Sequence, residues 1–505
     1  MAQLKNYKFA TQEQFSAANN EYEVLPHKAR TCAWDESTVL LTGETGEYLL
    51  LSQEDYSSFS SGEMSTTSTV FRDLRSRHFA VNKGRNPAFR AINSQMFTRK
   101  NFVNEGVKLH IFVLTIRCDH RCQYCQISPR KLDEVGFDMS YKTADAALDR
   151  VFESSEASFT IEFQGGEAAL AFDLLKHVVV AAEKRAEAED RDVRFVMTTT
   201  LHLLTTDMLE FCRDHEINLS SSLDGPEELH NACRINSKRD SFKKTVAGIQ
   251  RAREVCGPDS VSALTTVSRR SLGSAKQIVD TYVELGFTEI ALRPLSPYGF
   301  AVKSEGKLGY SVPEFLAFYA EALEYLIELN LKGTTLSESY ATLLLTRIMT
   351  PFATGYVDLQ SPCAAGQNVL VYNYDGGVFV SDEGRMLAET GCSAFRMGNV
   401  NDRLEKLYDS SAIQIIRENG SVDELEGCRD CAFAPYCGAD PVYHMATQGS
   451  PQGDRSTSGF CALHTGYFEL LFQYLAEKNA EVLRVFLSWI GKRPMSEIRK
   501  VGYMS

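Results

Sequence analysis

Two groups of cysteines in this 505-residue chain are spaced like metal ligands. The first has the pattern C-x3-C-x2-C, and the second has C-x2-C-x5-C with a further cysteine about two dozen residues later. In a reducing compartment, such clustering of thiols indicates metal binding rather than disulfides. The first group is Cys118, Cys122 and Cys125, and the second is Cys428, Cys431, Cys437 and Cys461.

The number of thiolates in each group suggests what it holds. Three thiolates can bind three irons of a [4Fe–4S] cluster and leave the fourth iron open for a small molecule. On spacing alone, a zinc site with a fourth ligand such as His120 is the alternative for the first group. Four thiolates, as in the second group, suit an iron–sulfur cluster and structural zinc equally well.

The elements that must position the first group form an alternating pattern. From residue 109 onward, short β-rich apolar runs alternate with helical stretches, which predicts a parallel sheet with helical crossovers. Six such units predict an α/β fold with a partial (β/α)6 TIM-type barrel, whose chemistry lies at the carboxyl ends of its strands. The predicted strands are 109–116, 158–163, 194–199, 217–223, 261–267 and 289–295.

The rest of the chain divides into flanking units. Residues 1–100 predict a small α+β unit, with two strands in 37–52, a loop over 56–68 and a helix over 69–80. The later part is irregular and rich in cysteine, and its end (464–492) predicts one helix. The expected domains are 1–100, the barrel 101–300, a helical connector 301–355, the cysteine-rich extension 356–470 and a C-terminal helix 471–505.

Glycines and polar residues follow two further predicted strands. The second strand ends in QGGE, and the fourth runs into SLDGPEELHNACR. Taken singly, the glycines fit a bulge or a tight turn, DGP fits a turn, and Arg234 fits a solvated charge. Together with the first cysteine group, these residues fall on strands one, two and four at the same rim of the barrel.

With these motifs, residues 109–300 resemble the radical S-adenosylmethionine (SAM) family. The resemblance implies that the open iron binds the amino and carboxylate groups of SAM, which is cleaved to a 5′-deoxyadenosyl radical that abstracts hydrogen. Two positions depart from the family pattern, with Ala168 where proline is common and Thr200 where asparagine is common. The implied SAM contacts are Tyr124, Gly165, Gly166, Glu167, Thr200, Ser222, Asp224 and Arg234.

The second cysteine group resembles the SPASM extension of radical SAM enzymes that act on peptides. The resemblance implies one auxiliary [4Fe–4S] cluster held by Cys428, Cys431, Cys437 and Cys461. A second auxiliary cluster lacks most of its expected ligands. Cys363 matches the first of them, but Ser381 and Asp440 stand at cysteine positions, and Cys392 would join only by an unusual path. We therefore expect a single auxiliary cluster.

Longer strings resemble a narrower group, the radical SAM maturases of His-Xaa-Ser peptide systems. Examples are LRPLSPYGFA (292–301), YNYDGGVFVSDEGRMLAETG (372–391) and CAFAPYCGADPVYHMATQG (431–449). This resemblance implies a maturase that cross-links side chains of a ribosomally made precursor peptide, with an electron donor such as flavodoxin or ferredoxin. The alternatives are a radical SAM enzyme acting on another protein (a formylglycine-type maturase) or on a small cofactor precursor, and a non-enzymatic zinc or electron-transfer protein.

The sequence leaves open which residue accepts a proton and what residues 1–100 do. Asp358, Asp382 and Glu383 lie in the strings most like the narrower group and are candidates for the proton acceptor that hydrogen abstraction needs, or are ordinary solvated carboxylates. Residues 1–100 either bind a leader peptide by adding its strand to a sheet edge or only pack on the barrel.

Charge and hydropathy restrict the partners. A formal net charge of −13 argues against a nucleic-acid partner, whose phosphates need a basic face. No apolar run is long enough to span a membrane, and the first residues lack the apolar core of a secretory signal. From the sequence we expect a cytoplasmic protein without a membrane partner.

Overall fold

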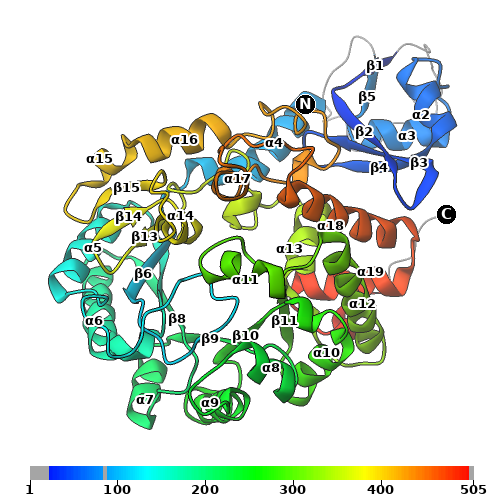
Figure 1. Ribbon diagram of the computed structural model, residues 1–505. Helices are drawn as coiled ribbons and strands as arrows, with labels where there is room; N and C mark the ends of the chain where they lie inside the picture. Colours follow the sequence, from blue (N-terminus) through cyan, green and yellow to red (C-terminus); the bar gives the residue numbers. More distant parts are fainter. Residues whose placement is uncertain (1–21, 83–87, 500–505) are drawn as a thin grey trace, which may run out of the picture.

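The computed structural model describes residues 22–82 and 88–499, and its centre is a ten-stranded sheet (Figure 1). The strand order is β12-β11-β10-β9-β8-β7-β6-β13-β14-β15, and β6 to β11 are parallel neighbours in chain order. This arrangement confirms the predicted partial (β/α)6 barrel. The barrel strands are β6 (Leu109–Thr115), β7 (Ser158–Gly165), β8 (Asp192–Thr198), β9 (Asn218–Ser222), β10 (Val261–Thr266) and β11 (Glu289–Arg293).

Helices cover the outer face of the barrel because each carries one apolar stripe. In α5, the buried residues Ala144, Ala147, Leu148 and Val151 recur at helical spacing and face the sheet. Strand β7 buries every second residue, as a strand with one face on the helices does. The crossover helices are α5 (Tyr141–Glu153), α6 (Phe172–Ala188), α7 (Thr206–Asp214), α8 (Glu227–Cys233), α9 (Ser241–Cys256) and α10 (Ala275–Glu284).

Both edges of the barrel sheet continue into other parts of the chain. Strand β13 (Val369–Tyr372) pairs parallel with β6, and β14 (Gly377–Phe379) and β15 (Arg396–Asn399) follow it antiparallel. At the other edge, β12 (Ser337–Glu338) pairs with β11. The C-terminal extension is thus built directly onto the first barrel strand, beside the cysteine loop.

The expected helical connector, residues 301–355, is interrupted by β12. It contains α12 (Val312–Leu331) and α13 (Ser339–Met349), preceded by α11 (Phe300–Leu308). Glu338 explains the break, because its buried carboxylate accepts hydrogen bonds from the backbone N–H groups of Ala341 in α13 and Leu292 in β11. A pairing of two residues is too short to leave a strand pattern in the sequence.

The N-terminal unit has its own small core, built around the antiparallel sheet β2-β3-β4. Its two predicted strands are confirmed as β3 (Asp35–Gly43) and β4 (Tyr48–Ser52). The predicted loop over 56–68 is wrong in its first part, where α2 (Gln53–Ser60) begins with Ser52 as its N-cap. The other elements are β1 (Tyr22–Val24), β2 (His27–Cys32), α3 (Thr69–Ser76), β5 (Ala80–Asn82) and, after the unit, α4 (Ala88–Lys100).

This unit lies against the C-terminal extension (Figure 1). Thr42 Oγ1 donates to the carbonyl of Ala432 at 2.8 Å, and Tyr436 Oη donates to the carbonyl of Gly46 at 2.9 Å. The ring of Tyr48 packs edge-on against that of Phe472. Packing against the extension is therefore one role of the N-terminal unit.

The predicted single helix over 464–492 is wrong, because two helices occupy this stretch. Lys478 adopts a left-handed conformation, and Asn479 caps the second helix. None of the helices among the described residues is long and apolar enough to cross a membrane. The helices of the extension are α14 (Asp382–Ala388), α15 (Leu404–Tyr408), α16 (Ser411–Asn419), α17 (Pro441–Gln448), α18 (Gly459–Ala476) and α19 (Ala480–Gly491).

Candidate active site and auxiliary metal centre

The loop that follows β6 carries Cys118, Cys122 and Cys125, and neighbouring elements hold its backbone in place. Its N–H groups at Arg121 and Gln123 donate to the carbonyls of Ile235 and Cys233 at 2.8 and 3.2 Å. On the opposite side, Phe300 N–H donates to the carbonyl of Cys125 at 2.9 Å. The loop is thus fixed between the fourth barrel unit and the segment after β11.

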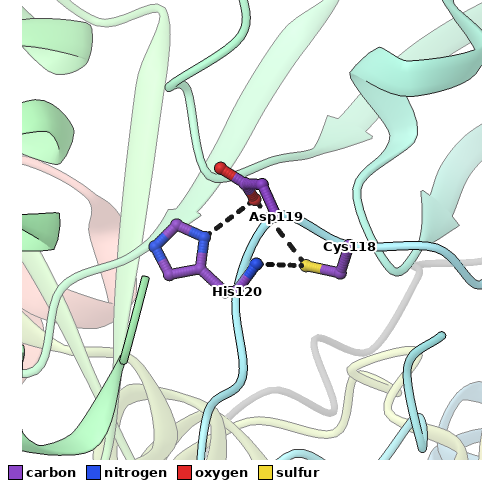
Figure 2. Close-up of side chains that lie close together, drawn as sticks. All are labelled: Cys118, Asp119 and His120. Atoms are coloured by element: carbon purple, nitrogen blue, oxygen red, sulfur yellow. Dashed lines mark hydrogen bonds and ion pairs between the residues drawn. The ribbon is translucent and has the colours of Figure 1, made fainter. Parts of the chain in front are cut away.

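His120, the fourth ligand of the zinc alternative, has both ring nitrogens engaged elsewhere. Its Nδ1 is hydrogen-bonded to Asp119 (Figure 2), with 2.8 Å between Nδ1 and Oδ1, and its Nε2 lies 2.9 Å from Ser241 Oγ. Ser241 in turn lies 3.0 Å from His230 Nε2. His120 therefore anchors the cysteine loop to α9 and has no ring nitrogen left for a metal.

The spacing of the thiols also differs from that of a zinc site. Four sulfurs around one zinc ion at about 2.3 Å lie roughly 3.8 Å from one another. In the described part of the chain, no three cysteine sulfurs of either group lie within 4.8 Å of one another. Neither group therefore has the thiol spacing of a tetrahedral zinc site.

Burial disfavours the charged thiolate form of the three cysteines in the first group when no metal is bound. It raises the pKa of Cys118 and Cys125, and it raises that of Cys122 to about 12. The positive charge of Arg234 acts in the opposite direction on the pKa of Cys122 and Cys125. A bound metal stabilises coordinating thiolates, so the buried donor set fits an iron–sulfur cluster.

The glycines of the GGE motif are required by a close backbone approach. A Cβ atom on Gly165 or Gly166 would lie 2.2 Å from the carbonyl oxygen of Thr115 or Arg117, respectively. The N–H groups of Gly166 and Glu167 donate to these same carbonyls, both at 2.8 Å. The end of β7 therefore lies directly against the base of the cysteine loop.

The carboxylate of Glu167 accepts hydrogen bonds from groups within the protein. The side chain is fully buried and accepts hydrogen bonds from Thr199 Oγ1 at 2.6 Å, Thr200 N–H at 2.6 Å and Ala169 N–H at 3.0 Å. These three donors hold the carboxylate in place at the end of β7. Thr200 lies buried just beyond β8, as part of the same network.

Three other predicted SAM contacts lie together. Tyr124 Oη donates to Asp224 Oδ2 at 2.5 Å and accepts from Arg234 Nη1 at 3.1 Å. Burial raises the pKa of Asp224, while Arg234 and the Tyr124 hydroxyl oppose that rise. This triad joins the cysteine loop to the end of β9, where Ser222 is half-buried.

The second cysteine group lines one small pocket of about 30 Å³. Its wall is otherwise largely apolar, with Phe433, Phe460 and Phe468, and with Arg455 as a cation beside Cys428. The arrangement of four thiols in an apolar pocket fits an auxiliary cluster. The four cysteines are Cys428, Cys431, Cys437 and Cys461.

The positions expected for a second auxiliary cluster serve other purposes. Ser381 Oγ accepts from Gly384 N–H at 3.1 Å as the cap of α14, and Asp440 Oδ1 accepts from Tyr443 N–H at 2.9 Å as the cap of α17. Cys363 is buried, with Asp358 and Asp440 in its electrostatic environment. Cys392 lies after α14, where its N–H donates to Leu387.

A cavity of about 680 Å³ runs along the inner face of the barrel to the extension. All three predicted acid–base residues, Asp358, Asp382 and Glu383, line it. Arg293 and Tyr298 also line the cavity, although the sequence motifs did not identify them as candidate site residues. Arg293 could have been found, because it ends β11, and barrel strands present functional side chains at their carboxyl ends.

The carboxylates of this cavity differ in their partners. Asp382 Oδ1 accepts from Arg385 Nε at 2.8 Å, and Glu383 lies 3.9 Å from Arg293. Burial raises the pKa of Asp358, which its acidic neighbours Asp440 and Glu383 raise further. Burial also raises the pKa of Asp440 to about 7. Groups of this kind can accept or hold a proton near neutral pH.

The comparison with protein families defines the class. Residues 112–281, from β6 into α10, match the family described as the Radical SAM superfamily. The chain therefore contains a radical SAM domain and is a radical SAM enzyme, with the cysteine loop at the expected end of its first strand.

Individual relatives are more distant. The chain is 21% identical over 374 residues to the cysteine-type anaerobic sulfatase-maturating enzyme of Clostridium perfringens (strain 13 / Type A), covering 71% of this chain and 94% of that protein. It is 23% identical over 355 residues to an uncharacterized protein of Archaeoglobus fulgidus, covering 68% of this chain and 78% of that one.

Solved structures share the fold. The structure of anSMEcpe with bound AdoMet has a TM-score of 0.61 and 18% identity, and the match covers 73% of this chain and 98% of that one. Streptococcus suis SuiB bound to its precursor peptide SuiA has a TM-score of 0.53 and 14% identity, and the match covers 86% and 99%.

Proposed function

We propose that this radical SAM enzyme modifies a ribosomally made precursor peptide, forming a cross-link between side chains. The observation that carries the proposal is the 680 Å³ cavity, which lies between the barrel and the extension and is large enough for several residues of a peptide. Its lining residue Tyr298 is two positions from Phe300, whose N–H donates to the Cys125 carbonyl of the cysteine loop at 2.9 Å.

In this proposal, different residues of the chain bind the cluster, bind SAM and accept a proton. The first cysteine group would hold the [4Fe–4S] cluster, and the backbone at Gly165–Glu167 with Tyr124, Asp224 and Arg234 would bind SAM. Bound SAM supplies the radical that removes hydrogen from the substrate. Asp358, Asp382 and Glu383 are our candidates for the proton acceptor; Asp382 pairs with Arg385 at 2.8 Å, and Glu383 lies farther from its partner Arg293, at 3.9 Å.

The second cysteine group would hold one auxiliary [4Fe–4S] cluster, and the proposed electron donor of the enzyme is a flavodoxin or a ferredoxin. The pocket of four cysteines supports this assignment, and the helix-capping roles of Ser381 and Asp440 argue against a second auxiliary cluster. Within the peptide maturases, the His-Xaa-Ser group remains our proposal on its sequence strings.

The N-terminal unit is our candidate for leader-peptide recognition. In its three-stranded sheet, β2 and β4 are the edge strands, and such edges can pair with an added strand. Hydrogen–deuterium exchange tests this role without altering the chain. Slower exchange in 27–32 or 48–52 on adding the precursor supports it, whereas unchanged exchange in both strands argues against it.

A formylglycine-type maturase is the second candidate, favoured by the similarity to the sulfatase-maturating enzyme of Clostridium perfringens. Co-expression with each substrate class separates the two. The chain is produced once with a small protein encoded beside its gene and once with a sulfatase peptide. Mass spectrometry showing a change only in the small protein supports the precursor-peptide function, and a change only in the sulfatase peptide contradicts it.

A further inference from the structure

The large cavity has an acidic end with too few cations to balance it. Asp358, Glu383 and Asp440 lie there, and their main cationic neighbour, Arg293, is 3.9 Å from Glu383. His464 adds no charge near neutral pH, because burial lowers its pKa to about 4. Burial and the neighbouring carboxylates raise the pKa of Asp358 and of Asp440, so a cation placed among the three groups would be stabilised as they give up their protons.

A buried hydroxyl group in the same place also lacks a partner. The side chain of Tyr298 is 3% exposed and lines the cavity, and its hydroxyl has no hydrogen-bond partner among the described residues. Asp440, Glu383 and Asp358 are its nearest electrostatic neighbours. An unsatisfied buried hydroxyl is costly, so it indicates a ligand that bonds to it.

The carboxylates are not arranged for a single metal ion. Oxygen ligands of one ion lie about 2.0–2.6 Å from it, so they lie within roughly 5 Å of one another. Among the described residues, Cys118, Asp119 and His120 form the only group of three or more whose ligand atoms lie within 4.8 Å of one another. The acidic end of the cavity is therefore spread too widely for an ion and fits an extended organic cation.

The remaining wall suits an aliphatic chain. Residues from three barrel strands and from α18 present apolar side chains to the cavity, which leads from the inside of the barrel to the acidic end. A ligand that combines an aliphatic stem with a cationic head matches both parts. The apolar residues include Ile111, Leu264, Leu292 and Leu463.

We infer that this cavity binds a lysine or arginine side chain of the substrate peptide. The stem lies along the barrel wall, and the cationic head lies among Asp358, Glu383 and Asp440, within reach of the Tyr298 hydroxyl. Tyr298 is two residues from Phe300, which contacts the cysteine loop, so the bound residue lies beside the reaction centre. The inference rests on the proposed function, since it names the residue class of a peptide substrate.

A binding experiment without SAM or reductant tests the inference. The full chain with its clusters is mixed with Gly-Ser nonapeptides that differ only at the central residue, which is Lys, Arg, norleucine or Glu. Mass spectrometry then quantifies the fraction retained after ultrafiltration. We expect Lys and Arg peptides to be retained about tenfold more than the norleucine peptide. Equal retention of the Lys and norleucine peptides would overturn the inference.

Variants of the lining residues test whether the Lys and Arg peptides bind in this cavity. D358N/E383Q should abolish the preference, and Y298F should reduce it about threefold. The matched control D207N/E254Q removes two exposed carboxylates and should keep the preference in full. A preference that survives in D358N/E383Q contradicts the assignment. If that double variant does not fold, Y298F and the norleucine comparison still decide the question.

Two further outcomes are informative. Competition by n-pentylamine as strong as that of the Lys peptide would show a site for free amines and overturn the assignment to a peptide side chain. The binding result is independent of turnover. A wild-type chain that modifies its precursor but shows no Lys or Arg preference would refute this inference and leave the proposed function standing.

Discussion

Tyr124 donates a 2.5 Å hydrogen bond to Asp224, and this bond joins the cysteine loop to the end of the fourth barrel strand. The two residues are 100 positions apart in the chain, and both are buried. Arg234 donates to the same phenol oxygen. The geometry of the cysteine loop thus depends on residues that the sequence suggested only as contacts to SAM.

Replacing Tyr124 by Phe should destabilise the protein by about 1–2 kcal/mol, because buried Asp224 loses a donor. It should also weaken SAM binding about tenfold. Anaerobic urea unfolding and equilibrium dialysis with SAM measure these effects. Tyr141→Phe, at an exposed tyrosine, is the matched control and should change neither quantity. Wild-type SAM affinity in the Tyr124 variant would contradict the assigned role.

Gly166→Ala should lower the free energy of unfolding by about 2 kcal/mol or more, since the new methyl group would lie 2.2 Å from the Arg117 carbonyl. The displaced loop should also lose the iron of the first cluster. Gly273→Ala has no atom within 4 Å of the new methyl group and should behave like the wild type. Equal stability of the two variants would show that the end of β7 can move away from the loop.

Iron analysis distinguishes the metal assignments. Anaerobically purified protein should contain about eight irons per chain, and about four should remain after Cys118, Cys122 and Cys125 are all changed to Ala. Removing Cys428 and Cys431 should have a similar effect, whereas Cys256→Ala should not change the count. About twelve irons in the wild type would indicate a second auxiliary cluster, and zinc in either site would contradict our assignment.

The stability of the protein should depend on Asp440. Its pKa is about 7 in the folded protein, above its ordinary value of 3.8, so between these pH values the folded state binds more protons than the unfolded state. The free energy of unfolding therefore falls as the pH rises through this window, by at most about 1.4 kcal/mol per pH unit.

Asp440→Asn removes this dependence and keeps a residue that caps a helix and tolerates the left-handed conformation found here. Urea unfolding from pH 4.5 to 7.5 should show a shallower decline in the variant than in the wild type. Parallel pH profiles would mean that Asp440 ionises normally.

The sequence predicted the barrel well because its strands and helices carry strong periodic patterns. Strands β6 and β7 fall where expected, and the cysteine loop follows β6. In contrast, β12 is a two-residue pairing fixed by the tertiary contacts of Glu338, and the division between α18 and α19 depends on the local conformation of Lys478. Such features leave little trace in a periodic pattern.

Site prediction was limited in a similar way. A motif identifies residues, but it does not show that the Glu167 carboxylate is occupied by Thr199 and Thr200. The grouping of Asp358 and Glu383 with Arg293 and Tyr298 requires segments far apart in the chain to meet in one cavity. Only the fold brings these segments together, so the acidic end of the cavity could not be predicted from spacing.

The most direct test of the account follows hydrogen from the peptide. The enzyme is incubated with SAM, a reductant and a precursor peptide that carries deuterium on its side chains. We predict 5′-deoxyadenosine that contains deuterium, together with a peptide that has lost hydrogen at the modified side chains. Formation of 5′-deoxyadenosine without deuterium, with the peptide unchanged, would contradict the claim that this enzyme acts on a precursor peptide.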